Sequence, residues 1–123
     1  MKIVATTSAP QAIGPYSQAI IVNDLVFTSG QIALKPDGSF LEGDVEAQTT
    51  QVLENLQAVL KEAGSSLQKV VKTTIFLANM DDFAKVNGVY GSFFGEHKPA
   101  RSTVGVKTLP RNALVEIEAI AAK

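Results

Sequence analysis

The sequence predicts an α+β sandwich, in which two helices pack on one face of a sheet. Short β-prone runs bounded by turn residues lie near both ends of the chain, and two longer segments between them have helical apolar spacing. No internal repeat, linker or low-complexity stretch divides the 123 residues. We therefore expect a single domain spanning residues 1–123, which is long enough to bury roughly two-thirds of the surface of its unfolded chain.

The first two predicted strands form a hairpin. Residues 17–22 and 25–29 are β-prone runs on either side of Asn23 and Asp24, a pair that tolerates positive φ in a tight turn. A second turn is predicted at residues 35–38, where Pro36 fixes its own φ and Gly38 can take the left-handed conformation.

The apolar period lengthens after Asp44 and predicts the first helix. Asp44 suits the N-cap position, and Gly64 lies where the helix would end. Residues that recur at steps of three and four form its apolar face, namely Val45, Thr49, Val52, Leu53, Leu56, Val59, Leu60 and Ala63.

A strand at residues 70–77 and a second helix follow. Alternation places four residues on one face of the strand, namely Val71, Thr73, Ile75 and Leu77. The helix is expected to begin near residues 79–82 and to end near Gly95. Its apolar stripe comprises Phe83, Val86, Tyr90, Phe93 and Phe94.

Asn87 lies on this apolar stripe, four residues after Phe83 and three before Tyr90. A buried amide that finds no partner costs about 1–3 kcal/mol. We therefore expect Asn87 to have a fixed hydrogen-bond partner. The spacing alone favours a structural amide over a ligand-binding one.

Residues 102–106 and 114–121 are the last predicted strands, joined across residues 110–112. The full order is two or three strands, a helix, a strand, a helix and two strands. Two helices cover only one face, so the other would expose apolar residues such as Val71, or Val115 and Ile117. Such a surface usually marks an interface, so we expect a homo-oligomer with sites at subunit boundaries.

The composition excludes several kinds of chemistry. There is no cysteine, which rules out disulfides, thiolate zinc sites and thiol nucleophiles, and only one histidine, His97. A serine–histidine–aspartate arrangement would need His97, for which a solvated loop position is the ordinary interpretation. The net charge is −1 and the basic residues are scattered, which disfavours a nucleic-acid partner. No apolar run suits a signal peptide or membrane span, so we expect a cytoplasmic protein.

Arg101 and two glutamates carry the strongest chemical signal. Arg101 opens a strand-like run after Pro99, and its planar guanidinium can bind a carboxylate through two hydrogen bonds. A structural salt bridge to Glu116 or Glu118 is an equal alternative at this point. Glu116 and Glu118 share one strand face, where either both are solvated or one orients a water molecule in a subunit cleft.

Four segments, taken together and in order, resemble the RidA (YjgF) family of imine deaminases. They are residues 13–19 (IGPYSQA), 28–32 (TSGQI), 86–90 (VNGVY), and 99–102 (PARS) with 115–119 (VEIEA). Each motif alone is weak, and the ordered set extends from about residue 5 to the C-terminus.

The resemblance implies a chorismate-mutase-like α+β fold, with a mixed sheet of about six strands and two helices on one face. It also implies a homotrimeric barrel with three inter-subunit sites. By similarity, Arg101 would bind the substrate carboxylate and Glu116 would position the attacking water. The residues that would line the pocket are Tyr16, Ser29, Gly30, Asn87 and Thr103.

The activity implied is hydrolysis of 2-iminopropanoate or 2-iminobutanoate to a 2-oxo acid and ammonia. Imines hydrolyse readily, so a positioned water and a proton acceptor suffice, and neither a metal nor a cofactor is expected. Many relatives have cysteine where this chain has Thr103, so thiol-dependent properties do not transfer through that position. Residues 105–108 are also less typical of the deaminase branch.

Two other functions compete with the deaminase. A trimer that binds a carboxylate ligand without turnover, and reports it to a regulator, would use Arg101 equally well. Ribonuclease activity ranks last, because the chain has neither a histidine pair nor a basic stripe.

Overall fold

A computed structural model describes all residues, 1–123. Its six strands form one mixed sheet in the order β1-β2-β3-β6-β4-β5. Neighbouring strands are antiparallel except β4 and β5, which are parallel and connected through a helix. The strands are β1 (Lys2–Val4), β2 (Ala19–Val22), β3 (Leu25–Thr28), β4 (Val70–Leu77), β5 (Ala100–Gly105) and β6 (Val115–Ala122).

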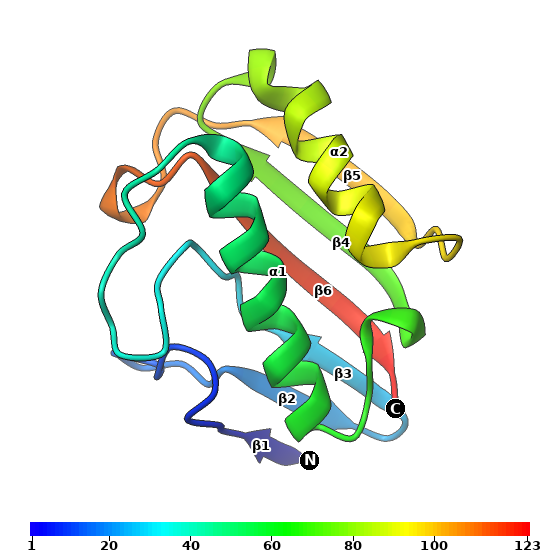
Figure 1. Cartoon of the computed structure of the whole chain (residues 1–123). Helices are drawn as coiled ribbons and strands as arrows, with labels where there is room; N and C mark the ends of the chain where they lie inside the picture. Colours follow the sequence, from blue (N-terminus) through cyan, green and yellow to red (C-terminus); the bar gives the residue numbers. More distant parts are fainter.

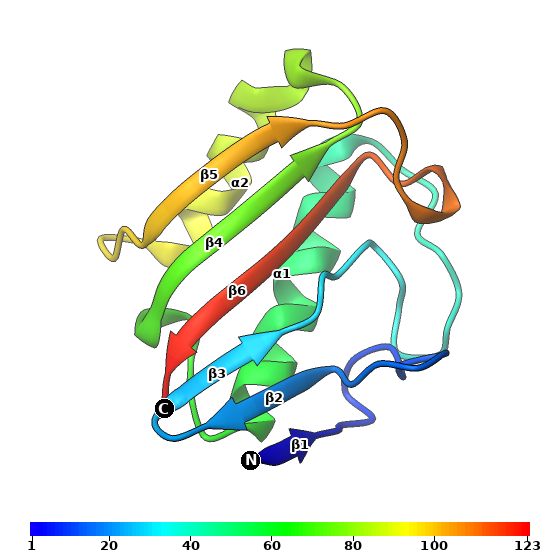
Figure 2. The same cartoon turned by 180° about the vertical axis from the view of Figure 1, so that it is seen from behind.

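Two helices cover one face of this sheet, α1 (Val45–Glu62) and α2 (Phe83–Phe94). They lie side by side in front of the strands in Figure 1, and the view from behind in Figure 2 shows that no helix covers the other face. Three 3₁₀ turns occupy connections, namely η1 (Leu67–Lys69), η2 (Met80–Asp82) and η3 (Pro110–Asn112). The α+β sandwich predicted from the sequence is confirmed.

The start of α1 follows the predicted capping chemistry. The Asp44 carboxylate accepts a 2.8 Å hydrogen bond from the Ala47 amide, and Gly64, with φ of 81°, lies just beyond the end of the helix. These contacts satisfy backbone groups that a helix terminus leaves without partners. All eight predicted apolar-face residues of α1 are buried.

The hairpin and turn predictions also hold. Val22 pairs with Leu25 across a two-residue loop in which Asn23 takes φ of 54°. By contrast, β1 has no counterpart among the predicted strands, because its three residues are too few for a period-two pattern to be visible.

The open face of the sheet is apolar over β1, β2 and β3, but two of the residues expected on this face lie on the other one. Ile3 is 63% exposed and aligns across the strands with Ile20, Phe27 and Ile120. Val115 and Ile117 instead point toward the helices and are fully buried, so placing them on the open face was wrong. Alternation along β6 therefore directs Glu116 and Glu118 to the open face.

Val71 departs from the strand face predicted for it. The register between β4 and β6 shifts between Val70 and Lys72, which is an irregularity of the bulge type. Thr73, Ile75 and Leu77 are fully buried as expected, whereas Val71 is 48% exposed. An extra residue in one strand inverts the inward and outward pattern on one side of it.

Candidate functional site

Glu116 lies beside the backbone of Gly30. A two-way backbone bridge holds them together, because the Gln31 amide donates to the Ile117 carbonyl at 2.9 Å and the Ile117 amide donates back at 3.1 Å. A Cβ atom built on Gly30 would lie 2.9 Å from Cδ of Glu116, and closer still to Oε2. Glycine at position 30 therefore leaves the space that the carboxylate fills.

The Glu116 carboxylate has a raised pKa. Partial burial is the main cause, and the neighbouring charge of Glu118 adds to it. No arginine or lysine forms an ion pair with Glu116. The carboxyl group is thus poised to accept a proton closer to neutral pH than an ordinary glutamate would.

Ser29 and Tyr16 border the same cavity of about 470 Å³, together with Gly30 and Glu116. The Ser29 hydroxyl donates to the Ser17 carbonyl at 2.5 Å, and the Ser29 amide donates to the Gln18 carbonyl at 2.9 Å. These two bonds fix the end of the first hairpin. The Tyr16 side chain is 53% exposed and makes no hydrogen bond within the chain.

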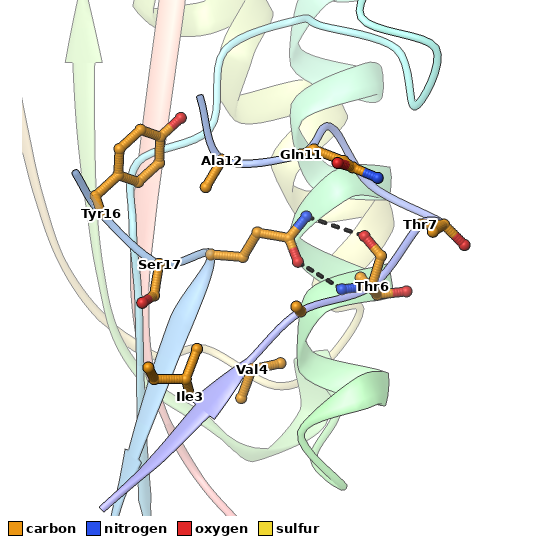
Figure 3. Close-up of a pocket in the computed structure, with 10 residues that line it drawn as sticks. Ile3, Val4, Thr6, Thr7, Gln11, Ala12, Tyr16 and Ser17 are labelled. Carbon is orange, nitrogen blue, oxygen red and sulfur yellow. Dashed lines mark hydrogen bonds between the residues drawn. The ribbon is translucent and has the colours of Figure 1, made fainter. Parts of the chain in front are cut away.

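A neighbouring cavity shows how Tyr16 is supported. This cavity of about 330 Å³ lies between the N-terminal segment and the start of β2, and Figure 3 shows Tyr16 and Ser17 on one side of it and Thr6 on the other. The Gln18 side chain bridges the gap, accepting from the Thr6 amide at 2.7 Å and donating to the Thr6 carbonyl at 3.1 Å. No carboxylate, lysine, arginine or histidine lines this cavity, and we assign it a structural role.

Arg101 is held by aromatic rings. Its guanidinium carbon lies 5.0 Å from the centre of the Tyr90 ring and 5.6 Å from that of Phe83, both on α2. These are cation–π distances. The Tyr90 hydroxyl is 2.7 Å from the Thr73 hydroxyl, and burial raises the pKa of Tyr90 despite that bond and the nearby Arg101 charge.

No carboxylate of the chain pairs with Arg101, so the structural salt bridge to Glu116 or Glu118 does not form. Its in-plane N–H groups remain available to a planar anion. Asn87, Tyr90 and Arg101 line one cavity of about 310 Å³.

Asn87 has no hydrogen-bond partner for its side chain within the chain, so the expected structural amide was wrong. The residue is half-buried at the wall of the cavity rather than in the core, because α2 lies over Arg101 of the edge strand β5. The amide is therefore free to bind a ligand.

Thr103 lies two residues after Arg101 on the same side of β5, paired with Ile75. Its hydroxyl is buried and has no hydrogen-bond partner, yet Thr103 lines neither of the two cavities. A substrate-binding role for Thr103 stays a prediction.

The predicted site residues fall into two groups on opposite faces of the sheet. Arg101 pairs with Thr73, which faces the helices, whereas Glu116 pairs with Phe76, three residues further along β4. Two strand spacings and three residues of rise separate their backbones by about 14 Å. The structure brings together Tyr16, Ser29, Gly30 and Glu116, and separately Asn87 and Arg101, but within one chain it does not unite the two groups.

His97 is not the solvated loop histidine that was expected. Its Nε2 lies 2.6 Å from the Val70 carbonyl and donates to it, and the ring is half-buried near Phe94. The histidine thus ties the α2–β5 connection to the start of β4. The sequence analysis did not predict that Phe83 and Tyr90 contact Arg101 or that His97 binds the Val70 carbonyl. These contacts depend on the long-range pairing of β4 and β5.

The structure contains no cluster of histidine, aspartate or glutamate that would bind a metal ion. No helix is both long and apolar enough to cross a membrane.

Comparison with known proteins gives one consistent result. Residues 6–123 match the family model described as Endoribonuclease L-PSP. The chain is 54% identical to the putative regulator AldR of Lactococcus lactis, over 98% of this chain and 97% of that protein. It is 46% identical to the 2-iminobutanoate/2-iminopropanoate deaminase of Salmonella typhimurium, over 99% and 98%. The crystal structure of E. coli TdcF with bound serine superposes with a TM-score of 0.95 at 44% identity, covering 100% of this chain and 99% of that one.

Proposed function

The chain belongs to the RidA (YjgF) family, and on that premise we propose that it hydrolyses small 2-imino acids to 2-oxo acids and ammonia. The observation that carries the proposal is the pair of unpaired groups already described. Arg101 is a fixed cation without a carboxylate partner, and Glu116 is a partly desolvated carboxylate without a cationic one. A substrate with a carboxylate next to an electrophilic carbon needs both a cation to bind the carboxylate and a base to activate water.

Arg101 would bind the substrate carboxylate. The rings of Phe83 and Tyr90 lie against the guanidinium and leave its edge free, which suits two parallel hydrogen bonds to a carboxylate. The free amide of Asn87 borders the same cavity, and its N–H groups can donate to an oxygen of the substrate carboxylate. The serine bound to the relative TdcF is likewise a small molecule with a carboxylate.

Glu116 would handle the proton of the attacking water. The water oxygen forms a bond to C2 of the protonated imine while Glu116 takes one of its protons. The protonated Glu116 then delivers that proton to nitrogen. The C2–N bond breaks with its electron pair going to ammonia, and Glu116 takes up the hydroxyl proton as C2 becomes a ketone. A raised pKa suits a group that both accepts and gives up a proton near neutral pH.

Within one chain, Arg101 and Glu116 lie on opposite faces of the sheet and cannot contact the same small substrate. The complete site therefore needs a second copy of the chain. We propose a homotrimer, as is typical of the family, in which the Arg101 group of one subunit meets the Glu116 group of the next. The uncovered apolar rows on β1, β2 and β3 support burial of the open face in such an assembly. A head-to-tail arrangement of this kind closes into a ring with as many sites as subunits.

The activity is tested by ammonia release from 2-iminobutanoate, generated in solution by an amino-acid oxidase with catalase present. The wild type should exceed the spontaneous rate, and Arg101→Ala should fall to that rate while keeping its fold and oligomeric state. Lys85→Ala, which removes an exposed charge from α2 outside both cavities, is the matched control. Activity of Arg101→Ala close to that of the wild type would rule out the assigned role of Arg101.

A regulator that binds a carboxylate without turnover is the second candidate, favoured by the name of the AldR relative. Equilibrium binding of 2-oxobutanoate separates the two functions. If the wild type binds it but never accelerates imine hydrolysis, the regulator is supported. If Glu116→Gln retains the affinity and loses the hydrolysis seen in the wild type, the enzyme is supported.

A further inference from the structure

Arg111 is a second arginine beside the candidate site, and the proposed reaction does not use it. Its residue lines the same cavity of about 470 Å³ as Glu116, Gly30 and Tyr16. The guanidinium carbon lies 5.5 Å from the centre of the Phe40 ring. No carboxylate of the chain forms an ion pair with it, Glu116 included.

The backbone places this side chain by an unusual turn. Arg111 has φ of 60° and Asn112 has φ of 55°, so two successive residues with side chains are left-handed. Each such residue costs about 1–2 kcal/mol, which the surrounding contacts must offset. The turn is closed by the Asn112 amide donating to the Leu109 carbonyl and the Ala113 amide donating to the Pro110 carbonyl, both at 3.1 Å.

Arg111 and Arg101 share one arrangement. Each guanidinium is held on an aromatic ring, and each lacks a carboxylate partner within the chain. Neither guanidinium donates a hydrogen bond within the chain, so the N–H donors of both arginines remain available to a ligand. Arg111 is therefore a second ready-made position for a planar anion, on the side of the site that carries Glu116.

Arg111 and Glu116 border one cavity, and no ion pair between them neutralises either charge. We propose that Arg111 binds a second carboxylate, at the far end of the substrate. The preferred substrate class is then the 2-imino dicarboxylates, such as the imine of glutamate. This inference rests on the proposed function, in which Arg101 binds the first carboxylate. Hydrolysis by the same addition of water and cleavage of the C2–N bond gives a 2-oxo dicarboxylate and ammonia.

The test compares 2-iminoglutarate with 2-iminobutanoate, each generated by an amino-acid oxidase. In Arg111→Gln, the ratio of kcat/KM for 2-iminoglutarate to that for 2-iminobutanoate should fall about tenfold, as expected for loss of one charge-assisted contact. Lys107→Gln removes the same charge from the same β5–β6 connection but lies outside the cavity, and its ratio should match that of the wild type. An unchanged ratio in Arg111→Gln, or an equal fall in Lys107→Gln, would overturn the proposal. So would a wild type that hydrolyses 2-iminobutanoate and not 2-iminoglutarate.

A binding measurement keeps this inference separate from the proposed function. If the wild type hydrolyses neither imine, the proposed deaminase fails, and calorimetric binding of 2-oxoglutarate and 2-oxobutanoate still tests Arg111. Arg111→Gln should weaken 2-oxoglutarate about tenfold relative to 2-oxobutanoate. Equal effects on the two ligands would show that Arg111 does not contact a second carboxylate.

Discussion

The carboxylate of Glu116 occupies the space that a side chain at Gly30 would need. A Cβ there would lie 2.9 Å from Cδ of Glu116 and 3.1 Å from Cγ. The bridge between Gln31 and Ile117 fixes both backbone segments, so neither can easily move away from the other. The pocket thus depends on glycine at this one place for the position of its proposed acid–base group.

Gly30→Ala should therefore displace Glu116 rather than unfold the protein. A misplacement of about 1 Å lowers catalytic rates by on the order of 100-fold, so we expect a kcat loss of about that size on 2-iminobutanoate. Gly88→Ala is the matched control, because a Cβ at Gly88 meets nothing within 4 Å. Full activity in Gly30→Ala, with the circular dichroism of the wild type, would contradict this role for the glycine.

Glu116→Gln should stabilise the protein against unfolding at neutral and higher pH. The pKa of Glu116 is raised above 4.5 by burial and by Glu118, so the folded state disfavours the charged form. Protonated Glu116 carries no charge and does not incur this cost. The free energy of unfolding of the wild type therefore falls, relative to that of Glu116→Gln, as pH rises through the folded pKa of Glu116. Melting temperatures should coincide near pH 4 and favour Glu116→Gln at pH 7–8. A difference that is constant across this range would mean that the Glu116 charge is not disfavoured by folding.

Phe83 should tune the affinity of Arg101 for a carboxylate. Phe83 is 37% exposed, and a cation–π contact at an exposed site is worth about 0.5–1 kcal/mol. Phe83→Leu should raise KM by a factor of about 2 to 5, with less effect on kcat.

Tyr90→Phe is the companion variant, since it keeps the second ring and removes only the hydroxyl bound to Thr73. It should lower the free energy of unfolding by about 1 kcal/mol in denaturant titrations and leave KM within about twofold. An unchanged KM in Phe83→Leu, or a larger KM change in Tyr90→Phe, would show that the rings do not hold Arg101 as inferred.

Local patterns were enough to predict most elements of the fold. The Asp44 cap, the apolar face of α1 and the Asn23 turn each depend on residues close together in sequence, and all three are found. Period two along β6 also predicted that Glu116 and Glu118 share one face and that Val115 and Ile117 share the other. The alternation alone did not show which face meets the helices, and Val115 and Ile117 were wrongly expected on the open one.

The relation between the two halves of the site could not be predicted from the sequence pattern. Whether Arg101 shares a face with Glu116 depends on the parallel register of β5 on β4 and the antiparallel register of β6, which no local signal specifies. The same pairing decides that His97 reaches the Val70 carbonyl. The side-chain partner expected for Asn87 failed for a related reason, because the sequence does not show that α2 borders the edge of the sheet.

Complementation between two inactive variants tests the central claim most directly. Arg101→Ala and Glu116→Gln should each be inactive alone on 2-iminobutanoate. If every site takes Arg101 from one subunit and Glu116 from the next, subunits unfolded together in equal amounts and refolded should regain about a quarter of wild-type activity, since that fraction of random interfaces combines the two intact residues. Mixed oligomers that form but stay as inactive as their parents would contradict a site shared between copies.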